Sequence, residues 1–185
     1  MSLFLIAPVT LLFLVFIFLV FVYNSLVTKR LRVKEAWSDI DVQLKRRSSL
    51  IPNLVESVKG YMKHEKELLT KVTELRSAVD NATSKEQKGK LSSELSSAVG
   101  KLNIAVESYP DLKANQNVMQ LQTELTDTED KISYSRRFYN TNVLGYNSAL
   151  QTFPTVLIAG SLGFKAEEFF EASEEEKKDV KVDLG

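Results

Sequence analysis

The stretch "VKEAWSDIDVQLKRRSSLIPNLVESVKGY", residues 33–61, decides the fold. Steps of alternately four and three residues through it meet an apolar or aromatic side chain at eight of nine positions. The positions are Val33, Trp37, Ile40, Leu44, Arg47, Ile51, Leu54, Val58 and Tyr61. A period near 3.5 residues is typical of helices packed side by side. The stretch therefore predicts a long helix with one buried face, on which Arg47 is the exception.

The same spacing returns in a second long segment, residues 118–149. Its members are Val118, Leu121, Leu125, Thr128, Ile132, Ser135, Tyr139, Asn142, Tyr146 and Ala149. Shorter helical patterns lie between the two long segments, and no strand-like alternation competes with them. We predict helices at about 24–62, 64–82, 86–108 and 112–151. The predicted fold class is all-α: an antiparallel up-and-down four-helix bundle with long first and last helices.

Two prolines interrupt these patterns. Pro52 costs about 3 kcal/mol in a helix interior, yet the apolar spacing keeps its phase through it. We therefore predict a kink or a tight restart there, with Ser49 as the cap, and a chain reversal around residues 62–64. Pro110 disfavours helix in the residue before it, and Asp111 can cap the last helix.

Residues 3–23, "LFLIAPVTLLFLVFIFLVFVY", carry no charge. At about 1.5 Å per residue they span roughly 30 Å, the thickness of the hydrocarbon core of a bilayer. A secretory signal peptide would have a basic start and a small-x-small cleavage site, and the sequence shows neither. The segment predicts an uncleaved, single-pass transmembrane anchor, and Pro8 falls within its first turns.

The basic residues that follow this segment predict its orientation. Lys29, Arg30, Arg32 and Lys34 come soon after it, whereas no charged side chain precedes it. Basic residues near the end of a span stay in the cytoplasm. We expect a protein of the bacterial inner membrane with its N-terminus outside and its C-terminal domain in the cytoplasm.

Composition removes most classes of enzyme. The chain of 185 residues has no cysteine and one histidine, His64, so it offers no disulfide, thiol nucleophile or thiolate metal site. Its 24 basic and 24 acidic residues balance, which argues against a nucleic-acid-binding protein. We predict no enzymatic activity, no cofactor, no metal and no nucleic-acid partner.

Four stretches form a dense, ordered set: "AWSDIDVQLKRRSSLIPNLVESVKGYMKHE", "ESYPDLKANQNVMQLQTELTDTEDKI", "RRFYNTNVLGYN" and "FPTVLIAGSLGF". They closely resemble the LemA family of bacterial membrane proteins, from Tyr23 to about Phe170. The resemblance implies an N-terminal anchor, an antiparallel helical bundle, no established enzymatic activity and no known cofactor. The family usually has an aromatic residue or histidine followed by aspartate just before "LIPNLV". Here Ser48 and Ser49 stand at those positions, so a binding role at position 48 is altered.

The stretch at 136–147 repeats a Tyr-Asn pair one heptad apart, Tyr139-Asn140 and Tyr146-Asn147. Both tyrosines fall on the apolar face, where their hydroxyls need a partner and the asparagines could supply one. Structural packing is the favoured interpretation, and a ligand site is the alternative. Arg136 and Arg137, just before the repeat, are candidates for contact with anionic lipid headgroups.

Arg47 is predicted to lie inside, where a guanidinium needs partners. Glu124, Glu129 and Asp130 are candidates, and Asp39 and Asp41 are less able to reach. A structural ion pair is favoured over an anion site. Trp37, Arg47, Pro52 and Pro110 are therefore interpreted as structural residues.

The segment 153–164 is apolar and too short to cross a bilayer. We expect it to combine packing against the membrane-proximal end of the helices with contact at the membrane interface, and Phe153 and Pro154 belong to the candidate interaction site. After it we predict a short helical end with Phe169 and Phe170 tucked in, followed by a mobile tail. The predicted domains are an anchor (1–24), a helical bundle (25–166) and a C-terminal tail (167–185).

Three functions compete at this point. The leading hypothesis is a non-enzymatic adaptor or scaffold for other membrane or envelope proteins. A sensor of lipid or of a small ligand at the membrane-proximal end of the bundle is the alternative. An enzyme would need a concave polar pocket with convergent acid and base groups.

Overall fold

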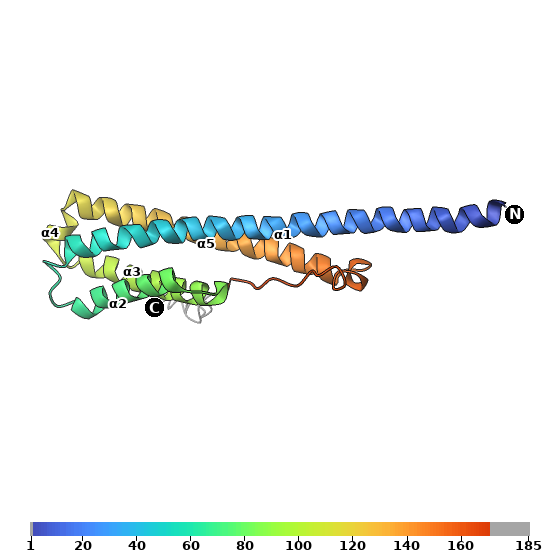
Figure 1. Cartoon of the computed structure of the whole chain (residues 1–185). Helices are drawn as coiled ribbons and strands as arrows, with labels where there is room; N and C mark the ends of the chain where they lie inside the picture. The colour runs from blue at the N-terminus through green and yellow to red at the C-terminus, as the bar shows by residue number, and fades with distance from the viewer. Residues whose placement is uncertain (1, 171–185) are drawn as a thin grey trace, which may run out of the picture. The chain divides into compact units, whose positions relative to one another are not determined.

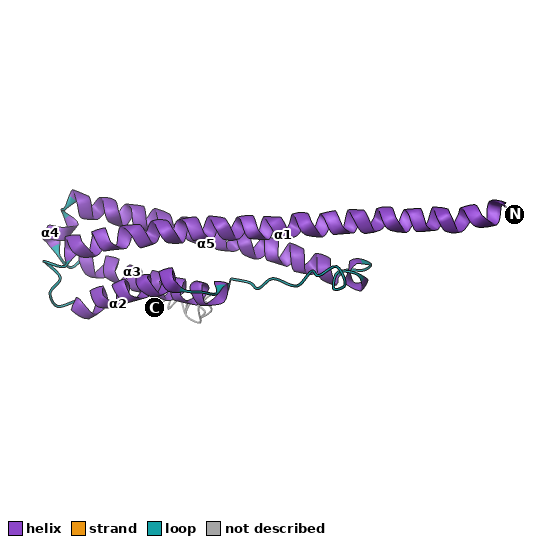
Figure 2. Cartoon of the chain, in the orientation of Figure 1, coloured by secondary structure: helices purple, strands orange, loops and turns teal. Residues whose placement is uncertain are grey.

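The structure, a computed structural model, describes residues 2–170, and within that range the side chains of residue 6 and of residues 8–170. The helices are α1 (Ser2–Val58), α2 (Lys66–Asn81), α3 (Lys85–Val106), α4 (Pro110–Lys113), α5 (Gln116–Gln151) and the 3-10 helix η1 (Thr155–Leu157) (Figure 1). No strand occurs between residues 2 and 170 (Figure 2). The all-α fold class is confirmed.

The described chain forms two compact units. The first unit comprises the N-terminal part of α1, up to Trp37, together with residues Phe138–Glu168. The second unit comprises Ser38–Arg137 and, among the described residues, 169 and 170. Helices α1 and α5 contribute to both units, and each unit is described below by itself. The predicted division into 1–24, 25–166 and 167–185 stays a prediction.

The second unit has one apolar core, to which α1, α2, α3, α4 and α5 all contribute. The side chains in it are those that the spacing of three and four residues places on one face of each long helix. Its buried members include Ile51, Leu54, Val58, Val72, Val79, Leu95, Val99, Leu102, Leu112, Val118 and Leu125. Burial of such faces is the main favourable term in helix packing. The antiparallel up-and-down order of four helices stays a prediction.

Helix α1 passes through Pro52 without interruption, since it extends from Ser2 to Val58. The predicted restart with Ser49 as its cap is therefore wrong. The Ser49 hydroxyl instead donates back to the carbonyl of Arg46, 2.7 Å away. The predicted reversal is confirmed, because α1 ends at Val58 and α2 begins at Lys66.

The connection before α5 also differs from the prediction. Pro110 occupies the first turn of the short helix α4, after the extended residue Tyr109, and α5 begins at Gln116 rather than near 112. Asp111 lies within α4. The cap of α5 is Asn115, whose Oδ1 accepts hydrogen bonds from the amides of Asn117 (3.0 Å) and Val118 (3.3 Å).

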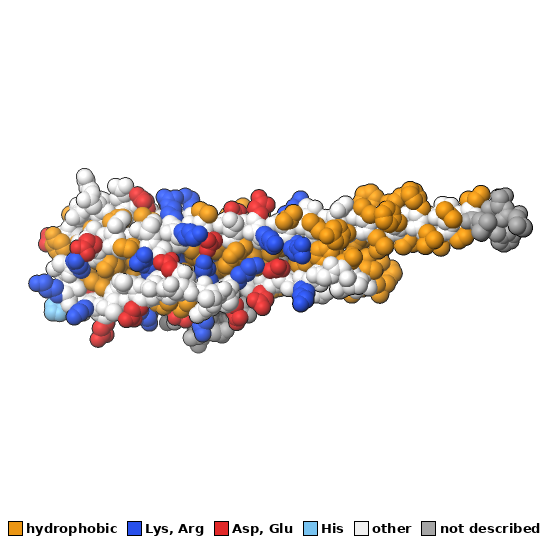
Figure 3. Space-filling model, viewed as in Figure 1, with side chains coloured by type: hydrophobic (Ala, Val, Ile, Leu, Met, Phe, Trp, Pro, Cys, Tyr) orange, Lys and Arg blue, Asp and Glu red, His pale blue; other side chains and the backbone are white. Residues whose placement is uncertain are grey.

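In the first unit, the apolar stretch of α1 is exposed. From Pro8 onward this helix is long and apolar enough, by length and composition, to cross a membrane. Figure 3 shows hydrophobic side chains gathered on its N-terminal part, while Lys, Arg, Asp and Glu are spread over the helices that follow. Farther along α1, burial begins with Leu26, Val33 and Ala36. The exposed stretch is where the sequence predicts the anchor.

Candidate functional site

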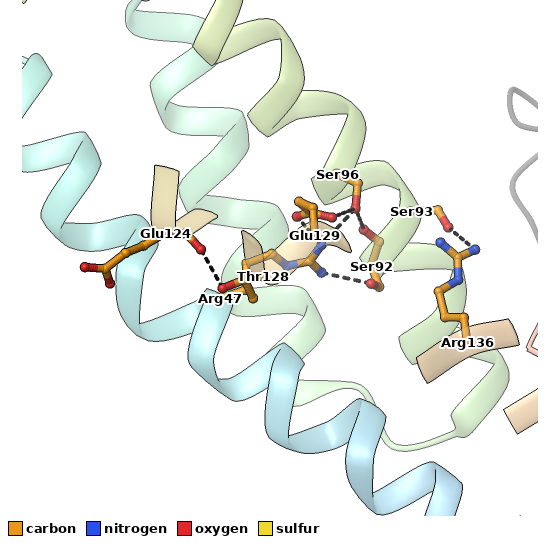
Figure 4. A network of polar contacts seen from close by, with 8 residues as sticks. All are labelled: Arg47, Ser92, Ser93, Ser96, Glu124, Thr128, Glu129 and Arg136. Atoms are coloured by element: carbon orange, nitrogen blue, oxygen red, sulfur yellow. Dashed lines mark hydrogen bonds and ion pairs between the residues drawn. The ribbon is translucent and has the colours of Figure 1, made fainter. Parts of the chain in front are cut away.

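A buried polar network joins three helices of the second unit (Figure 4). The Arg47 side chain is 0% exposed. Its Nη1 donates to Glu129 Oε1 on α5 and to Ser96 Oγ on α3, each at 2.8 Å, and its Nη2 donates to Ser92 Oγ at 2.8 Å. Ser96 Oγ in turn donates to the other Glu129 oxygen at 2.7 Å. Of the three predicted acidic partners, Glu129 is the one that pairs with Arg47.

The other two candidates lie elsewhere. Glu124 contributes its backbone carbonyl to the Thr128 hydroxyl at 2.7 Å, and its carboxylate accepts from Gln120. Asp130 is exposed. The arrangement around Arg47 is closed and its charge is neutralised, so it suits a structural role better than the capture of an anion from solvent.

A second polar cluster joins α1 to α2, and sequence reasoning missed it. Arg76 Nε donates to the Ser48 carbonyl and to the Ser48 hydroxyl, both at 3.0 Å. The hydroxyl donates to Asp80 Oδ2 at 2.6 Å. The Ser48 side chain thus makes its contacts within the chain. The available signal was Pro52, which has no N–H to bond the carbonyl four residues earlier.

In the first unit, the Tyr-Asn repeat holds the chain's own returning segment, residues 164–168. Asn147 Oδ1 accepts from the Glu167 amide at 3.0 Å, and Asn147 Nδ2 donates to the Glu167 carbonyl at 2.8 Å. The Tyr139 hydroxyl donates to the Glu168 carbonyl at 2.9 Å. Both side chains therefore bind the backbone of the returning segment, which is a structural use of the residues proposed as a ligand site.

The aromatic residues of the first unit complete this arrangement. Trp37 meets Tyr139 edge-on, with ring centroids 5.5 Å apart. Tyr146 is buried, and burial raises the pKa of its hydroxyl, which stays protonated at neutral pH. Asn140, the remaining member of the repeat, is half-buried. The buried, protonated hydroxyl of Tyr146 therefore does not act as a base, and the side chain contributes to packing.

The two candidate arginines before the repeat differ in their surroundings. Within the second unit, Arg136 Nη2 donates to Ser93 Oγ at 3.1 Å, and its guanidinium carbon lies 4.6 Å from the centre of the Phe170 ring. Phe170 is buried, as predicted, and its ring lies next to Gly89. Phe169 is 45% exposed, so the prediction that it is tucked in is wrong. Arg137 is exposed.

The returning segment and the residues after it correct one prediction. Residues 167–170 are not helical, so the predicted helical end is wrong for them. The backbone of Glu167 and Glu168 is instead bound by side chains of α5. The rest of the predicted tail, 171–185, lies outside the described residues.

The apolar segment before it divides into buried and exposed side chains. Ala159 and Phe164 are buried and Pro154 is half-buried, whereas Phe153 is 80% exposed. The Phe164 ring lies edge-on to Tyr23, 5.6 Å between centroids, with the Arg30 guanidinium carbon 5.2 Å from its centre. The segment 153–164 therefore packs against α1 through Phe164 and leaves Phe153 exposed.

The hollows on the surface of the second unit are open to solvent and are lined by both polar and apolar side chains. One of about 510 Å³ lies between α1 and α5, lined by Asp39, Gln43, Asp130, Lys131 and Tyr134 among others.

The remaining titratable groups of the second unit include Asp41 and His64. Hydrogen bonds from Lys88 (2.7 Å) and then from Lys45 lower the pKa of Asp41. Within residues 2–170, no group of three His, Cys, Asp or Glu could hold a metal ion. His64 is exposed in the turn after α1.

Comparison with known proteins gives a consistent result. A sequence model of the LemA family matches residues 36–184. The chain is 35% identical over 158 residues to Protein LemA of Metamycoplasma hominis. That alignment covers 85% of this chain and 72% of the relative. It is 25% identical over 174 residues to Magnetosome protein MamQ of Magnetospirillum gryphiswaldense and over 175 residues to Magnetosome protein MamQ 1 of Paramagnetospirillum magneticum. Each alignment covers 80% of this chain and 64% of the magnetosome protein, so the chain spans less than two thirds of their length.

Proposed function

This chain belongs to the LemA family, and we propose that it is a non-enzymatic, membrane-anchored adaptor or scaffold for other envelope proteins. That it is a membrane-associated helical protein agrees with its family and its exposed apolar helix. The observation that carries the proposal is the continuity of α1. One unbroken helix contains both the apolar stretch and the side chains Ile51, Leu54 and Val58 of the second unit's core.

The use of the polar residues supports the same proposal. Arg47, Glu129, Ser92 and Ser96 bond to one another, and Tyr139 and Asn147 bond to the returning segment. These polar groups make their contacts within the fold and stabilise it. An anchored body that presents surface to partners needs no more chemistry than this. A sensor of lipid or of a small ligand at the Tyr-Asn repeat has less support, because its ligand would have to displace the returning segment.

The proposed location is the bacterial inner membrane, with the N-terminus outside and the C-terminal domain in the cytoplasm. The basic residues Lys29, Arg30, Arg32 and Lys34 after the apolar stretch support that orientation. A reporter fused to the C-terminus, active only on one side of the membrane, tests it. Activity restricted to the outer side would contradict the orientation.

Photo-crosslinking in intact membranes tests the adaptor role. A photoreactive amino acid replaces Ile104, which is 73% exposed on α3, and separately Tyr134 on α5. We expect a reproducible adduct with the same envelope protein from at least one position. The matched control replaces Val99, which is buried on α3, and should give no intermolecular adduct. Recovery of the uncrosslinked chain alone from both exposed positions would overturn the proposal, and adducts with lipid alone would favour the sensor.

A further inference from the structure

The segment between α5 and the returning segment, residues 152–163, is called here the apolar loop. It has the sequence "TFPTVLIAGSLG" and no charged residue. Several of its large side chains point to solvent: Phe153 is 80% exposed, Leu157 is 71% exposed and Val156 is 48% exposed. Exposed apolar side chains that gather in this way mark a contact surface.

Several polar groups of the apolar loop bond within it or to the end of α5. The Ser161 hydroxyl donates to the Ile158 carbonyl at 2.8 Å, and the Thr152 hydroxyl donates to the Ala149 carbonyl at 3.3 Å. Backbone amides of the loop bond to its own carbonyls, with Val156 to Thr152 and Ala159 to Thr155 both at 2.9 Å. Each such internal hydrogen bond lowers the cost of moving a backbone group into a medium poor in water.

The contacts of the residue that follows the apolar loop indicate how deep in the bilayer the loop is expected to lie. Phe164, directly after the loop, packs on Tyr23 and beneath Arg30 of α1. Tyr23 is the last residue of the apolar stretch 3–23, the first charged side chain is Lys29, and Arg30 lies roughly 10 Å beyond Tyr23 along the helix. The headgroup layer begins where the hydrocarbon span ends and is about 5–8 Å thick on each side. The contacts of Phe164 thus place this residue, next to the loop, beside residues of α1 that are expected at the depth of that layer.

We propose that the apolar loop lies in the headgroup layer of the bilayer and is a second membrane contact beside α1. Phe153, Val156 and Leu157 enter the boundary with the acyl chains, as the apolar side chains of interfacial segments do. Figure 3 shows hydrophobic side chains on α1 and, at the loop's place in Figure 1, next to it. The proposal goes beyond the adaptor role and does not depend on it.

Cysteine labelling tests the proposal, since the chain has no cysteine of its own. The full chain is placed in vesicles of phosphatidylcholine and phosphatidylglycerol with Phe153→Cys or Leu157→Cys, each labelled with an environment-sensitive fluorophore. We expect severalfold stronger quenching by lipids spin-labelled near the headgroup than for Ile104→Cys, an equally exposed apolar position of the second unit. Two loop positions guard against a local disturbance by one substitution, and circular dichroism checks the helix content of each variant.

Val15→Cys, in the middle of the apolar stretch 3–23, serves as the reference for the span and is read with lipids spin-labelled deep in the acyl chain, because a headgroup label lies about 15 Å from the bilayer centre. Lipid quenching there together with quenching at 153 and 157 supports the proposal. Labels at 153 and 157 that are reached by iodide in water as readily as at 104 would overturn it. Labels shielded from iodide yet not quenched by lipid would also overturn it, because a protein surface would then cover the loop. An unquenched label at 15 would overturn the anchor and the proposal together.

Discussion

Pro52 and Arg76 act on the same carbonyl group. Proline has no N–H, so Pro52 leaves the Ser48 carbonyl without its usual helical donor. Arg76 on α2 supplies a donor from its Nε at 3.0 Å. The break in the hydrogen-bond ladder of α1 is thus compensated by a neighbouring helix, which explains how α1 continues through Pro52.

A double-mutant cycle tests this compensation. Arg76→Leu should cost about 1–3 kcal/mol of unfolding free energy in the parent, because a buried carbonyl loses its donor. In the Pro52→Ala background the residue at 52 regains its N–H, and the same substitution should cost less by about 0.5–1.5 kcal/mol. Chemical unfolding of the full chain in detergent, followed by circular dichroism, measures all four proteins. Equal costs in both backgrounds would refute the compensation.

The Arg47–Glu129 pair should respond asymmetrically to mutation. Glu129→Ala leaves a fully buried guanidinium without its counter-charge and should cost about 3–5 kcal/mol. Arg47→Met leaves Glu129, whose side chain is 26% exposed and can be hydrated, and should cost less than about 2 kcal/mol. Glu124→Ala, on the same helix, is the control and should change stability by less than about 0.5 kcal/mol. A larger loss of unfolding free energy for Arg47→Met than for Glu129→Ala would contradict this prediction. It would show that the burial of the Arg47 guanidinium does not determine which substitution costs more.

Hydrogen exchange should report the contact between Asn147 and the returning segment. Asn147→Ala removes the acceptor of the Glu167 amide, so that amide should exchange at least about tenfold faster, as expected for loss of a hydrogen bond of about 1.4 kcal/mol. Tyr139→Phe removes only a donor to the Glu168 carbonyl and should accelerate this amide less. The control is Asn142→Ala, since Asn142 bonds to the Phe138 carbonyl on its own helix. Unchanged exchange in Asn147→Ala would contradict the assigned contact.

Two glycines of α3 provide a matched test of the packing of Phe170. A Cβ at Gly100 meets nothing within 4 Å, so Gly100→Ala should stabilise the helix by about 0.5–1 kcal/mol. A Cβ at Gly89 lies 3.3 Å from the Phe170 ring, which must shift, so Gly89→Ala should gain less or lose stability. Thermal unfolding of the two variants measures the difference. The same gain at both positions would mean that Phe170 does not pack against Gly89.

Asp41 should make stability depend on pH. Lys88 and Lys45 lower the pKa of this carboxyl in the folded state, so the unfolded chain binds the proton more readily and stability rises with pH through this range. The contribution is present above about pH 4 and is lost as the pH falls through the lowered pKa. Asp41→Asn should therefore cost about 0.5 kcal/mol at neutral pH, as expected for a partly exposed pair, and nothing in strong acid. A cost that does not change with pH would contradict this origin.

The spacing of apolar residues predicted much of the fold, for a physical reason. A helix repeats every 3.6 residues, so the sequence alone states which side chains share a face. Ile51, Leu54 and Leu125 are buried as this spacing predicts. Caps were predicted less well. Ser49 and Asp111 have side chains that can cap a helix, but Ser49 lies inside α1 and Asp111 lies inside α4. Asn115 precedes the first residue of α5 and is its cap.

The candidate site was less predictable, because its partners are distant in sequence. The spacing placed Tyr139 and Tyr146 inside, where they lie. It could not show that the partner of Asn147 is the Glu167 backbone, since backbone groups are the same at every residue. Likewise Arg76 lies 28 residues from Ser48, and only the fold brings them together. The roles of Arg137 and Asn140 in binding stay predictions.

The edge-on pair of Trp37 and Tyr139 has a practical consequence. Trp37 is the single tryptophan of the chain, so its intrinsic emission comes from one known place. Tyr139 touches the indole on one side and holds the Glu168 carbonyl on the other. Native fluorescence, recorded without any added dye, would therefore signal when the returning segment detaches from α5.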